Sequence, residues 1–314
     1  MKPAFSQTEI STGTNSDDDA FFANALANPP IPADLTLAQA RDVLDSLASL
    51  SPAIPSDVVV THIDANGASA EWLTPPHARA KRAILYARGG SYTMGRKPGI
   101  WQYPISRIAH LAEVAALIVN YRLAPESPFP AARDDVVSAY QYLLKQGYEG
   151  KHIVLCGDSC GVGLVIQALL AIRDAGTVLP AGVVAIGAWI DLANEGETRV
   201  SNPPEALALL ENLKATAALY LGSTSSKDPR ANPLYADLTG LPHFRLMVGS
   251  IEALRDDSTR FAEAAGARGV DVRVEIWQNL HHGWYLFPNQ INATERTYEH
   301  FASFVAEFIP AQPR

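Results

Sequence analysis

The feature that most limits the fold is a regular alternation, from about residue 58 onward, of short apolar runs and longer helical patterns. The apolar runs predict strands at 58–63, 68–73, 83–87, 115–121, 152–157, 183–190, 244–250 and 272–277. Helical spacing between them predicts helices at roughly 98–112, 133–146, 161–174, 205–221, 256–268 and 293–308. Short buried strands separated by helices are typical of a mostly parallel sheet with helices on both faces. The sequence therefore predicts an α/β fold with an eight-stranded sheet.

The chain also changes in character near residue 55. Residues 1–18 are polar, and we expect them to be flexible and outside any sheet. A short helix is predicted at 19–27 with Asp19 as its cap, and a second at 35–50 with Asp34 as its cap. The first two strands are close enough for an antiparallel hairpin with "DANG" as its turn. The expected organisation is an N-terminal helical segment (1–55), an α/β core (56–193), an inserted segment (194–237) and further core (238–314).

Composition excludes several classes of function. The formal net charge is -8 with a pI near 5.5, whereas nucleic-acid binding requires a basic face. No apolar run reaches the roughly 18 residues of a membrane span. The first twenty residues lack the apolar stretch of a secretory signal, so we expect a cytoplasmic protein. Cys156 and Cys160 are too few for a disulfide framework or, alone, a zinc site, and we expect two buried small residues.

The stretch "LCGDSCGVG" (155–163) is the first candidate for chemistry. It places Ser159 in a G-x-S-x-G pattern at the junction of a predicted strand and a predicted helix. In such a turn the serine hydroxyl projects from the end of the strand, where it can act as a nucleophile. The same residues are also compatible with a plain tight turn that carries a polar residue.

Two further stretches could complete a nucleophilic site. Gly89 and Gly90 follow a predicted strand, so their backbone N–H groups can turn toward one point where an oxyanion develops. "NLHHGWYLF" (279–287) supplies His281 and His282 after the last predicted strand. An ordinary glycine turn and a structural histidine remain the alternatives. The order serine, acid, histidine is that of an α/β-hydrolase triad.

Taken together, four stretches resemble the hormone-sensitive-lipase-like family of α/β-hydrolases over roughly residues 58–308. They are "ARGGSY", "NYRLAPESPFPAARDDVVSAYQYLL", "GDSCGVG", and "DPRANPLYADLTGLPHFRLMVGSIEALRDDS" with the following "LHHGWYLF". The later segments most resemble bacterial enzymes related to monoterpene ε-lactone hydrolases. The resemblance implies an α/β-hydrolase fold. It also implies that the hydrolase core is formed by residues 56–193 and 238–314, and a helical cap by the N-terminal segment 1–55 and the insertion 194–237.

The resemblance also implies a triad. Ser159 matches the family nucleophile and His282 matches the family base, because "HGW" aligns with a His-Gly-Phe-like triplet. Glu252 falls at the acid position. Asp256 and Asp257 are the local rivals, and we expect them to begin the following helix, where acidic residues act as caps.

The same alignment implies an oxyanion hole made by the backbone of Gly90, Ser91 and Cys160. Two residues depart from the family pattern: Arg88 replaces a histidine, and Ser91 replaces a glycine. If the Ser91 position requires a positive φ, the loop is strained. Arg88 could brace the glycine loop or contact the substrate.

These roles imply that the chain hydrolyses carboxylic esters or lactones through an acyl-enzyme, with no metal and no organic cofactor. Candidates to line an apolar substrate pocket are Arg88, Tyr92, Trp189, Trp284 and Tyr285, although core packing explains each aromatic equally well. The alternative function is a non-catalytic small-molecule receptor on the same fold. Family members often form homodimers, and the sequence leaves the oligomeric state and the natural substrate open.

Overall fold

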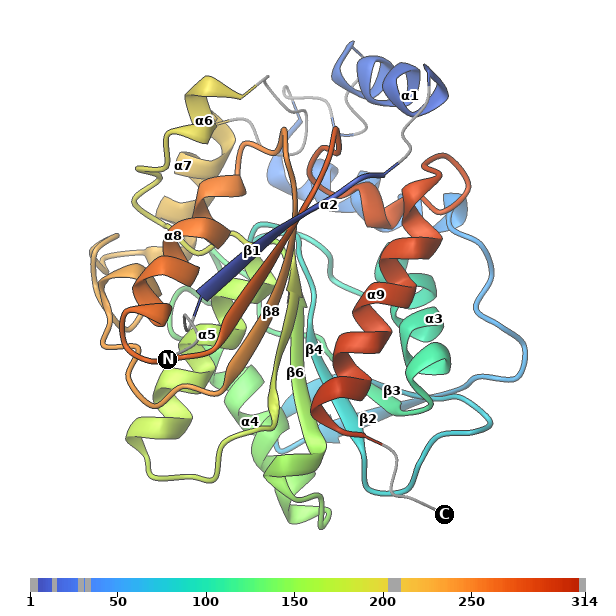
Figure 1. The fold of residues 1–314 in the computed structure, drawn as a ribbon, viewed down its shortest axis with the longest axis vertical. Helices are drawn as coiled ribbons and strands as arrows, with labels where there is room; N and C mark the ends of the chain where they lie inside the picture. Colours follow the sequence, from blue (N-terminus) through green and yellow to red (C-terminus); the bar gives the residue numbers. More distant parts are fainter. Residues whose placement is uncertain (1–4, 13–15, 28–30, 32–34, 203–209, 311–314) are drawn as a thin grey trace.

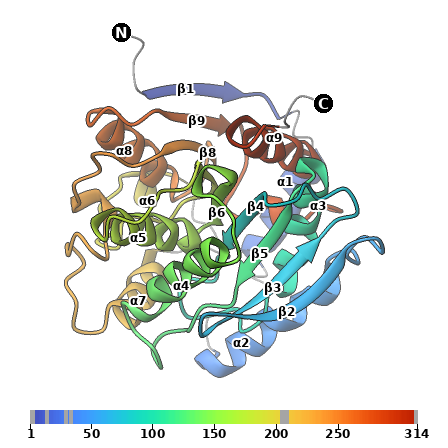
Figure 2. The ribbon, with the colours of Figure 1, turned by 90° about the horizontal axis from the view of Figure 1, so that it is seen from below.

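The fold is built on one twisted sheet, seen here in a computed structural model that describes residues 5–12, 16–27, 31, 35–202 and 210–310. Within these ranges the sheet has nine strands, in the order β1-β9-β8-β7-β6-β4-β5-β3-β2 (Figure 2). The strands are β1 (Phe5–Ile10), β2 (Val59–Ala65), β3 (Ala68–Thr74), β4 (Ala83–Ala87), β5 (Ala115–Val119), β6 (Ile153–Asp158), β7 (Gly182–Ile186), β8 (His243–Gly249) and β9 (Val272–Trp277). β2–β3 and β3–β5 pair antiparallel and every other pair is parallel. The predicted α/β class and the predicted hairpin are confirmed.

The N-terminal strand was not predicted. β1 pairs in parallel with β9, from Phe5 opposite Val272 to Ile10 opposite Trp277, so the expectation that this segment lies outside any sheet is wrong. Figure 2 shows β1 as the outermost strand beside β9. Its four central residues are exposed and polar, and only the two ends are half-buried. An edge strand held by main-chain hydrogen bonds needs no apolar run, and therefore gave no apolar signal.

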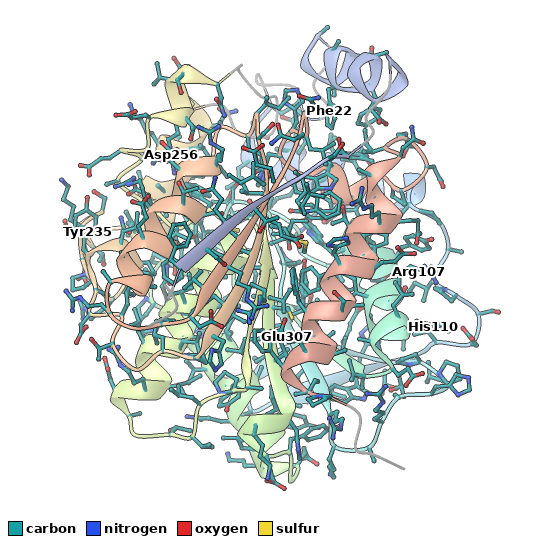
Figure 3. The ribbon with its side chains drawn as sticks, in the orientation of Figure 1. Phe22, Arg107, His110, Tyr235, Asp256 and Glu307 are labelled. Carbon is teal, nitrogen blue, oxygen red and sulfur yellow. The ribbon has the colours of Figure 1, made fainter. Side chains whose placement is uncertain are left out.

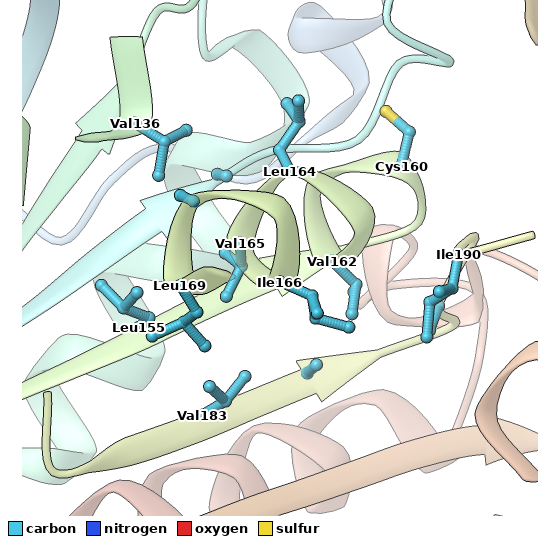
Figure 4. Close-up of a cluster of buried hydrophobic side chains, with 14 of the residues drawn as sticks. Val136, Leu155, Cys160, Val162, Leu164, Val165, Ile166, Leu169, Val183 and Ile190 are labelled. Atoms are coloured by element: carbon cyan, nitrogen blue, oxygen red, sulfur yellow. The ribbon is translucent and has the colours of Figure 1, made fainter. Parts of the chain in front are cut away.

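Helices cover the two faces of the sheet. α4 (Ala131–Lys145), α5 (Cys160–Asp174) and α8 (Arg255–Gly266) lie on one face, and α3 (Gln102–Ala112) and α9 (Ala293–Phe308) lie on the other (Figure 2). The central helix α5 is apolar almost all round, because it lies between the sheet and neighbouring helices. Its Val165 and Leu169 belong to one buried cluster with Leu155 of β6 and Val183 of β7 (Figure 4).

The remaining helices gather at the carboxyl end of the parallel strands. α1 (Ser16–Ala27), α6 (Thr198–Ser201) and α7 (Leu210–Leu221) lie toward the upper end of Figure 1. Phe22 and Asp256 are labelled near that end in Figure 3, and Glu307 lies lower, on the last turn of α9. Residues 205–209 of the predicted helix 205–221 lie outside the described residues. No helix of the described residues combines the length and apolar character needed to cross a bilayer.

Both N-terminal helices begin at residues other than those predicted. α1 starts at Ser16, so Asp19 lies inside the helix and not at its start. α2 (Leu37–Ser46) is capped by Thr36, whose hydroxyl accepts the N–H of Gln39 while the Gln39 side chain accepts the N–H of Thr36. This reciprocal pair is a capping box. The predicted cap, Asp34, lies outside the described residues.

Candidate active site

Ser159 occupies a strained turn between β6 and α5. Its backbone has φ 51° and ψ -127°, a conformation that non-glycine residues adopt only when the surrounding structure enforces it. The flanking glycines are required by close packing. A Cβ on Gly161 would lie 2.0 Å from the carbonyl oxygen of Ala87, and one on Gly157 would lie 2.9 Å from the backbone of Gly161. The strain therefore directs the Ser159 side chain away from the sheet, as in a nucleophile elbow.

Ser159, His282 and Glu252 form a hydrogen-bonded chain. His282 Nε2 lies 3.0 Å from Ser159 Oγ, and His282 Nδ1 lies 2.9 Å from Glu252 Oε2. The other carboxylate oxygen of Glu252 accepts the N–H of Gly249 at 2.8 Å. Glu252 is fully buried, whereas Ser159 and His282 each keep 8% of their surface exposed. The structure thus brings together the three predicted residues from loops that follow three different strands.

The two rival acids are engaged elsewhere. α8 begins at Arg255, so Asp256 and Asp257 lie in its first turn. Asp257 forms a fully buried ion pair with Arg199 at 2.6 Å, and it also accepts two backbone N–H groups. Asp256 accepts the N–H of Thr198 at 3.0 Å. Both carboxylates therefore attach the segment after β7 to α8, whereas the carboxylate bonded to His282 is that of Glu252.

The glycine loop after β4 is strained at the residue that departs from the family pattern. Ser91 has φ 53° and Tyr92 has φ 62°, so two successive non-glycine residues adopt the left-handed conformation. Gly90 has φ 110°. Among the described residues, no acceptor takes a hydrogen bond from the N–H of Gly90 or Ser91. Both residues line the same cavity as Ser159 and His282, so these donors lie beside the serine.

Cys160 is the first residue of α5, where helix geometry leaves the backbone N–H without an intrahelical acceptor. Its thiol accepts the N–H of Tyr92 at 3.2 Å, which attaches the glycine loop to the helix. Burial raises the pKa of the Cys160 thiol to about 11, so the thiol stays protonated near neutral pH and is no nucleophile.

Arg88 is fully buried below the glycine loop. Its Nη1 donates to the carbonyl oxygens of Gly89 and Met94, at 3.0 Å and 2.9 Å. The guanidinium lies over the ring of Tyr121, 4.5 Å from its centroid. Arg88 does not belong to the described cavity wall, and these contacts favour bracing of the loop over contact with a substrate.

Asp158 is a site residue that the sequence analysis did not single out. Its buried carboxylate accepts hydrogen bonds from the N–H of Gly89 (2.7 Å) and the side chains of Trp101 (2.9 Å), Tyr285 (2.9 Å) and Tyr86 (3.0 Å). Burial raises the pKa of Asp158, and the hydrogen bonds partly offset this because they favour the charged form. The carboxylate joins the glycine loop to the loop that carries His282. The available signal was its position directly before the serine.

A small apolar cavity of about 80 Å³ opens beside Ser159. Its wall combines Ser159, His282 and the glycine loop with mainly apolar side chains, among them Leu44, Leu47, Met94, Ile100, Trp101, Tyr285, Leu286 and Phe287. Of the predicted aromatic lining residues, Tyr285 belongs to this wall. The structure places the other three in the core. Tyr92 stacks on Tyr220 and contacts Trp189, and Trp284 donates to Thr297.

A larger hollow of about 810 Å³ lies apart from this site. It is lined by residues 76–82 together with Glu113, Gly147, Glu149 and His152, near the amino ends of β4 and β6. Its wall is mostly polar and contains none of the predicted site residues. The apolar cavity at the carboxyl end is therefore the better candidate for binding an ester.

The sheet, the strained serine turn and the Ser–His–Glu chain define an α/β-hydrolase, and the sequence agrees. Residues 84–286 match the family described as alpha/beta hydrolase fold, and the chain belongs to this family. It is 39% identical over 252 residues to an acetyl-hydrolase from Streptomyces hygroscopicus, covering 80% of this chain and 82% of the relative. It is 33% identical over 273 residues to an esterase from Acinetobacter venetianus, covering 85% and 89%.

Solved structures show the same relationship. The crystal structure of an esterase from the bacterial hormone-sensitive lipase family superposes with a TM-score of 0.88 at 34% identity, covering 95% of this chain and 99% of that one.

Among the sequence relatives, a gibberellin receptor from Oryza sativa subsp. japonica is more distant. It is 26% identical over 239 residues, covering 72% of this chain and 67% of the relative.

Proposed function

We propose that this chain is a serine hydrolase that cleaves carboxylic esters with short acyl groups. The observation that carries the proposal is the continuous chain from Ser159 Oγ through the His282 ring to the buried Glu252 carboxylate. A nucleophile, a base and an acid that orients the base are the groups that acyl transfer requires. The names of the two curated relatives, acetyl-hydrolase and esterase, support the same chemistry.

The geometry suggests the following sequence of steps. His282 Nε2 removes the hydroxyl proton as Ser159 Oγ forms a bond to the ester carbonyl carbon. The carbonyl oxygen becomes an oxyanion, and the N–H groups of Gly90, Ser91 and Cys160 would stabilise it. The bond to the alcohol breaks, and His282 returns the proton to the departing oxygen. Water, deprotonated by His282, then attacks the acyl-enzyme and releases the acid and the free serine.

The proposed preference for short acyl groups rests on the cavity. About 80 Å³ of space is far less than the roughly 300 Å³ at the lower end of drug-sized ligand pockets. An acetyl or propionyl group fits such a space, and its apolar wall favours the methyl end of the acyl chain. Lactones are the alternative substrates implied by the sequence resemblance.

A non-catalytic receptor is the alternative function. A receptor needs a pocket, but it does not need a histidine in hydrogen-bond contact with both a serine and a buried carboxylate. The alignment of all three groups within 3.0 Å supports the enzyme over the receptor.

Hydrolysis of p-nitrophenyl acetate, butyrate and octanoate, beside ε-caprolactone, tests the proposal. We expect turnover that is fastest on acetate, and stoichiometric labelling of the wild-type protein by a fluorophosphonate. Ser159→Ala should abolish both while keeping the circular dichroism spectrum of the wild type. Folded wild-type protein that neither turns over esters nor reacts with the probe would favour the receptor.

A further inference from the structure

The Arg41 side chain reaches from α2 to the loop that carries the proposed oxyanion donors. Its Nε donates to the carbonyl oxygen of Thr93 at 2.7 Å, and its Nη2 donates to the carbonyl oxygen of Ala124 at 2.8 Å. The same guanidinium forms a two-pronged contact with the Glu126 carboxylate, at 2.6 Å and 2.8 Å. Only 11% of the Arg41 side chain is exposed. Its planar guanidinium thus donates to three partners at once.

The loop that Arg41 contacts needs external support. Left-handed φ values at Ser91 and Tyr92 cost about 1–2 kcal/mol each, and such strain persists only where surrounding contacts enforce it. The carbonyl oxygen of Gly90 accepts the N–H groups of Thr93 and Met94, which closes the loop into a turn. Arg88 then holds the Met94 carbonyl from the core side, and Arg41 holds the Thr93 carbonyl from the cap side.

This turn fixes the direction of the Ser91 N–H. The C=O of Gly90 and the N–H of Ser91 belong to one planar peptide unit and point in opposite directions. Because the Gly90 carbonyl is fixed by the N–H groups of Thr93 and Met94, whatever holds these two residues also orients the Ser91 donor.

Arg41 also stands next to the cavity wall. Leu44 lies three residues further along α2, on the same side of the helix, and Leu47 follows in the next turn. Both leucines line the cavity beside Ser159. One guanidinium therefore connects the helix that supplies part of the acyl-pocket wall to the loop that supplies the oxyanion donors.

We propose that Arg41 is a positioning residue that couples the seating of α2 to the geometry of the oxyanion loop, and thereby affects both turnover and acyl-length selection. This inference rests on the proposed ester hydrolysis. A plain tether between α2 and the core would affect stability alone.

Arg96 provides a matched control. It lies just beyond the same loop, and its guanidinium binds α2 through Asp42 and through Asp45, the latter at 2.8 Å. Its described contacts reach only these carboxylates and no carbonyl oxygen of the loop. Arg96→Ala thus removes an arginine and two ion pairs to α2, and leaves the Thr93 and Ala124 carbonyls bound to Arg41.

The experiment measures kcat and KM of wild type, Arg41→Ala, Arg41→Lys and Arg96→Ala on p-nitrophenyl acetate, butyrate and octanoate. Full loss of an oxyanion donor lowers kcat by roughly 10²–10³, and we expect Arg41→Ala to lower kcat on acetate by at least about 10-fold. The ratio of kcat/KM for acetate to that for octanoate should fall about 3-fold or more as α2 loosens. Arg96→Ala should stay within about 3-fold of wild type in both respects.

Arg41→Lys keeps the charge but lacks the planar fork, so its kinetics should resemble those of Arg41→Ala. It also provides the test if Arg41→Ala does not fold, since thermal unfolding is followed for every variant. Equal kinetics of folded Arg41 variants and Arg96→Ala, or a change confined to the melting temperature, would overturn the inference. An inactive wild type would instead refute the proposed function, so the two failures are distinguishable.

Discussion

Replacing Arg88 by Met should reduce turnover much more than it reduces stability. Arg88 Nη1 and the hydroxyl of Tyr121 both donate to the carbonyl oxygen of Gly89, each at 3.0 Å. This fixes the peptide unit between Gly89 and Gly90, and the Gly90 N–H must point in the opposite direction, toward the cavity. Without the guanidinium this peptide unit keeps one of its two restraints, and the proposed oxyanion donor becomes mobile.

The stability cost of Arg88→Met can be estimated from its contacts. The Met94 carbonyl loses its only donor among the described residues, which costs about 1–3 kcal/mol. In the opposite direction, Arg88 is a buried charge with no carboxylate partner in the described part of the chain, and removing it relieves a desolvation penalty of several kcal/mol. Met retains most of the apolar volume. The two effects oppose each other, so we expect the free energy of unfolding to change by less than about 2 kcal/mol.

The effect on kcat should be larger. Loss of one oxyanion donor costs roughly 10²–10³ in kcat, so a loosened donor should cost about 10–100-fold on every ester alike. The assay compares kcat and KM of wild type, Arg88→Met and the control Arg107→Met, whose arginine pairs with Glu295 on α9. One neutral ester and one carboxylate-bearing ester are used. A raised KM confined to the charged ester, with kcat unchanged on both, would refute bracing and favour contact with the substrate.

Three further predictions test other parts of the site. Glu252→Gln should lower kcat on the order of 10⁴-fold, because the amide favours the wrong tautomer of His282. Asp256→Asn should change kcat by less than about 10-fold, and the opposite ranking in steady-state kinetics would refute the assignment of Glu252 as the acid. Ser91→Gly should raise the free energy of unfolding, measured in urea, by about 0.5–1 kcal/mol, because glycine tolerates φ 53°. Ser91→Ala keeps the backbone strain and should not raise the free energy of unfolding, so equal effects of the two changes would contradict the strain argument. The hydrogen bond from Arg41 lowers the pKa of Glu126 to about 2, below its usual 4.5, so ionised Glu126 stabilises the fold above pH 4.5 and loses this effect as the pH falls toward 2. The stability difference between wild type and Glu126→Gln is below about 1 kcal/mol, because 61% of the Glu126 side chain is exposed. It should be constant from pH 5 to 8 and shrink only at lower pH; a difference that vanishes at pH 6 would show that the contact is not made in solution.

Most of the sheet could be predicted because its inner strands give recognisable patterns of apolar residues in the sequence. β4 has the predicted bounds because its five residues are apolar and buried on both faces, which leaves a continuous run between turns. β9 also has the predicted bounds, and its sequence VRVEIW instead alternates apolar and charged residues. β1 could not be predicted in this way. Its stability comes from main-chain pairing with β9, and exposed polar side chains such as Gln7 carry no trace of that pairing.

The candidate site likewise has a part that could be predicted from the sequence and a part that could not. Ser159 and His282 could be located by motif and order, because each follows a recognisable strand, and Glu252 by the resemblance to the family. The groups around them depend on packing between distant segments. Nothing in the local sequence of Trp101 indicates that its indole N–H reaches Asp158, 57 residues away. The sequence around Arg41 is likewise typical of an exposed helix residue, and it does not indicate the contact with Thr93.

The pairing of β1 with β9 has a consequence for folding during synthesis. Phe5 must find Val272, 267 residues later in the chain, so β1 is made before the other strands of this sheet and can be placed only after β9. Until it docks, the outer edge of β9 presents unpaired N–H and C=O groups, which in a nascent or refolding chain can recruit a strand from another molecule. Contacts this distant in sequence also form slowly. In the interval between completion of the sheet core and the docking of residues 5–10, the β9 edge is therefore open to intermolecular pairing.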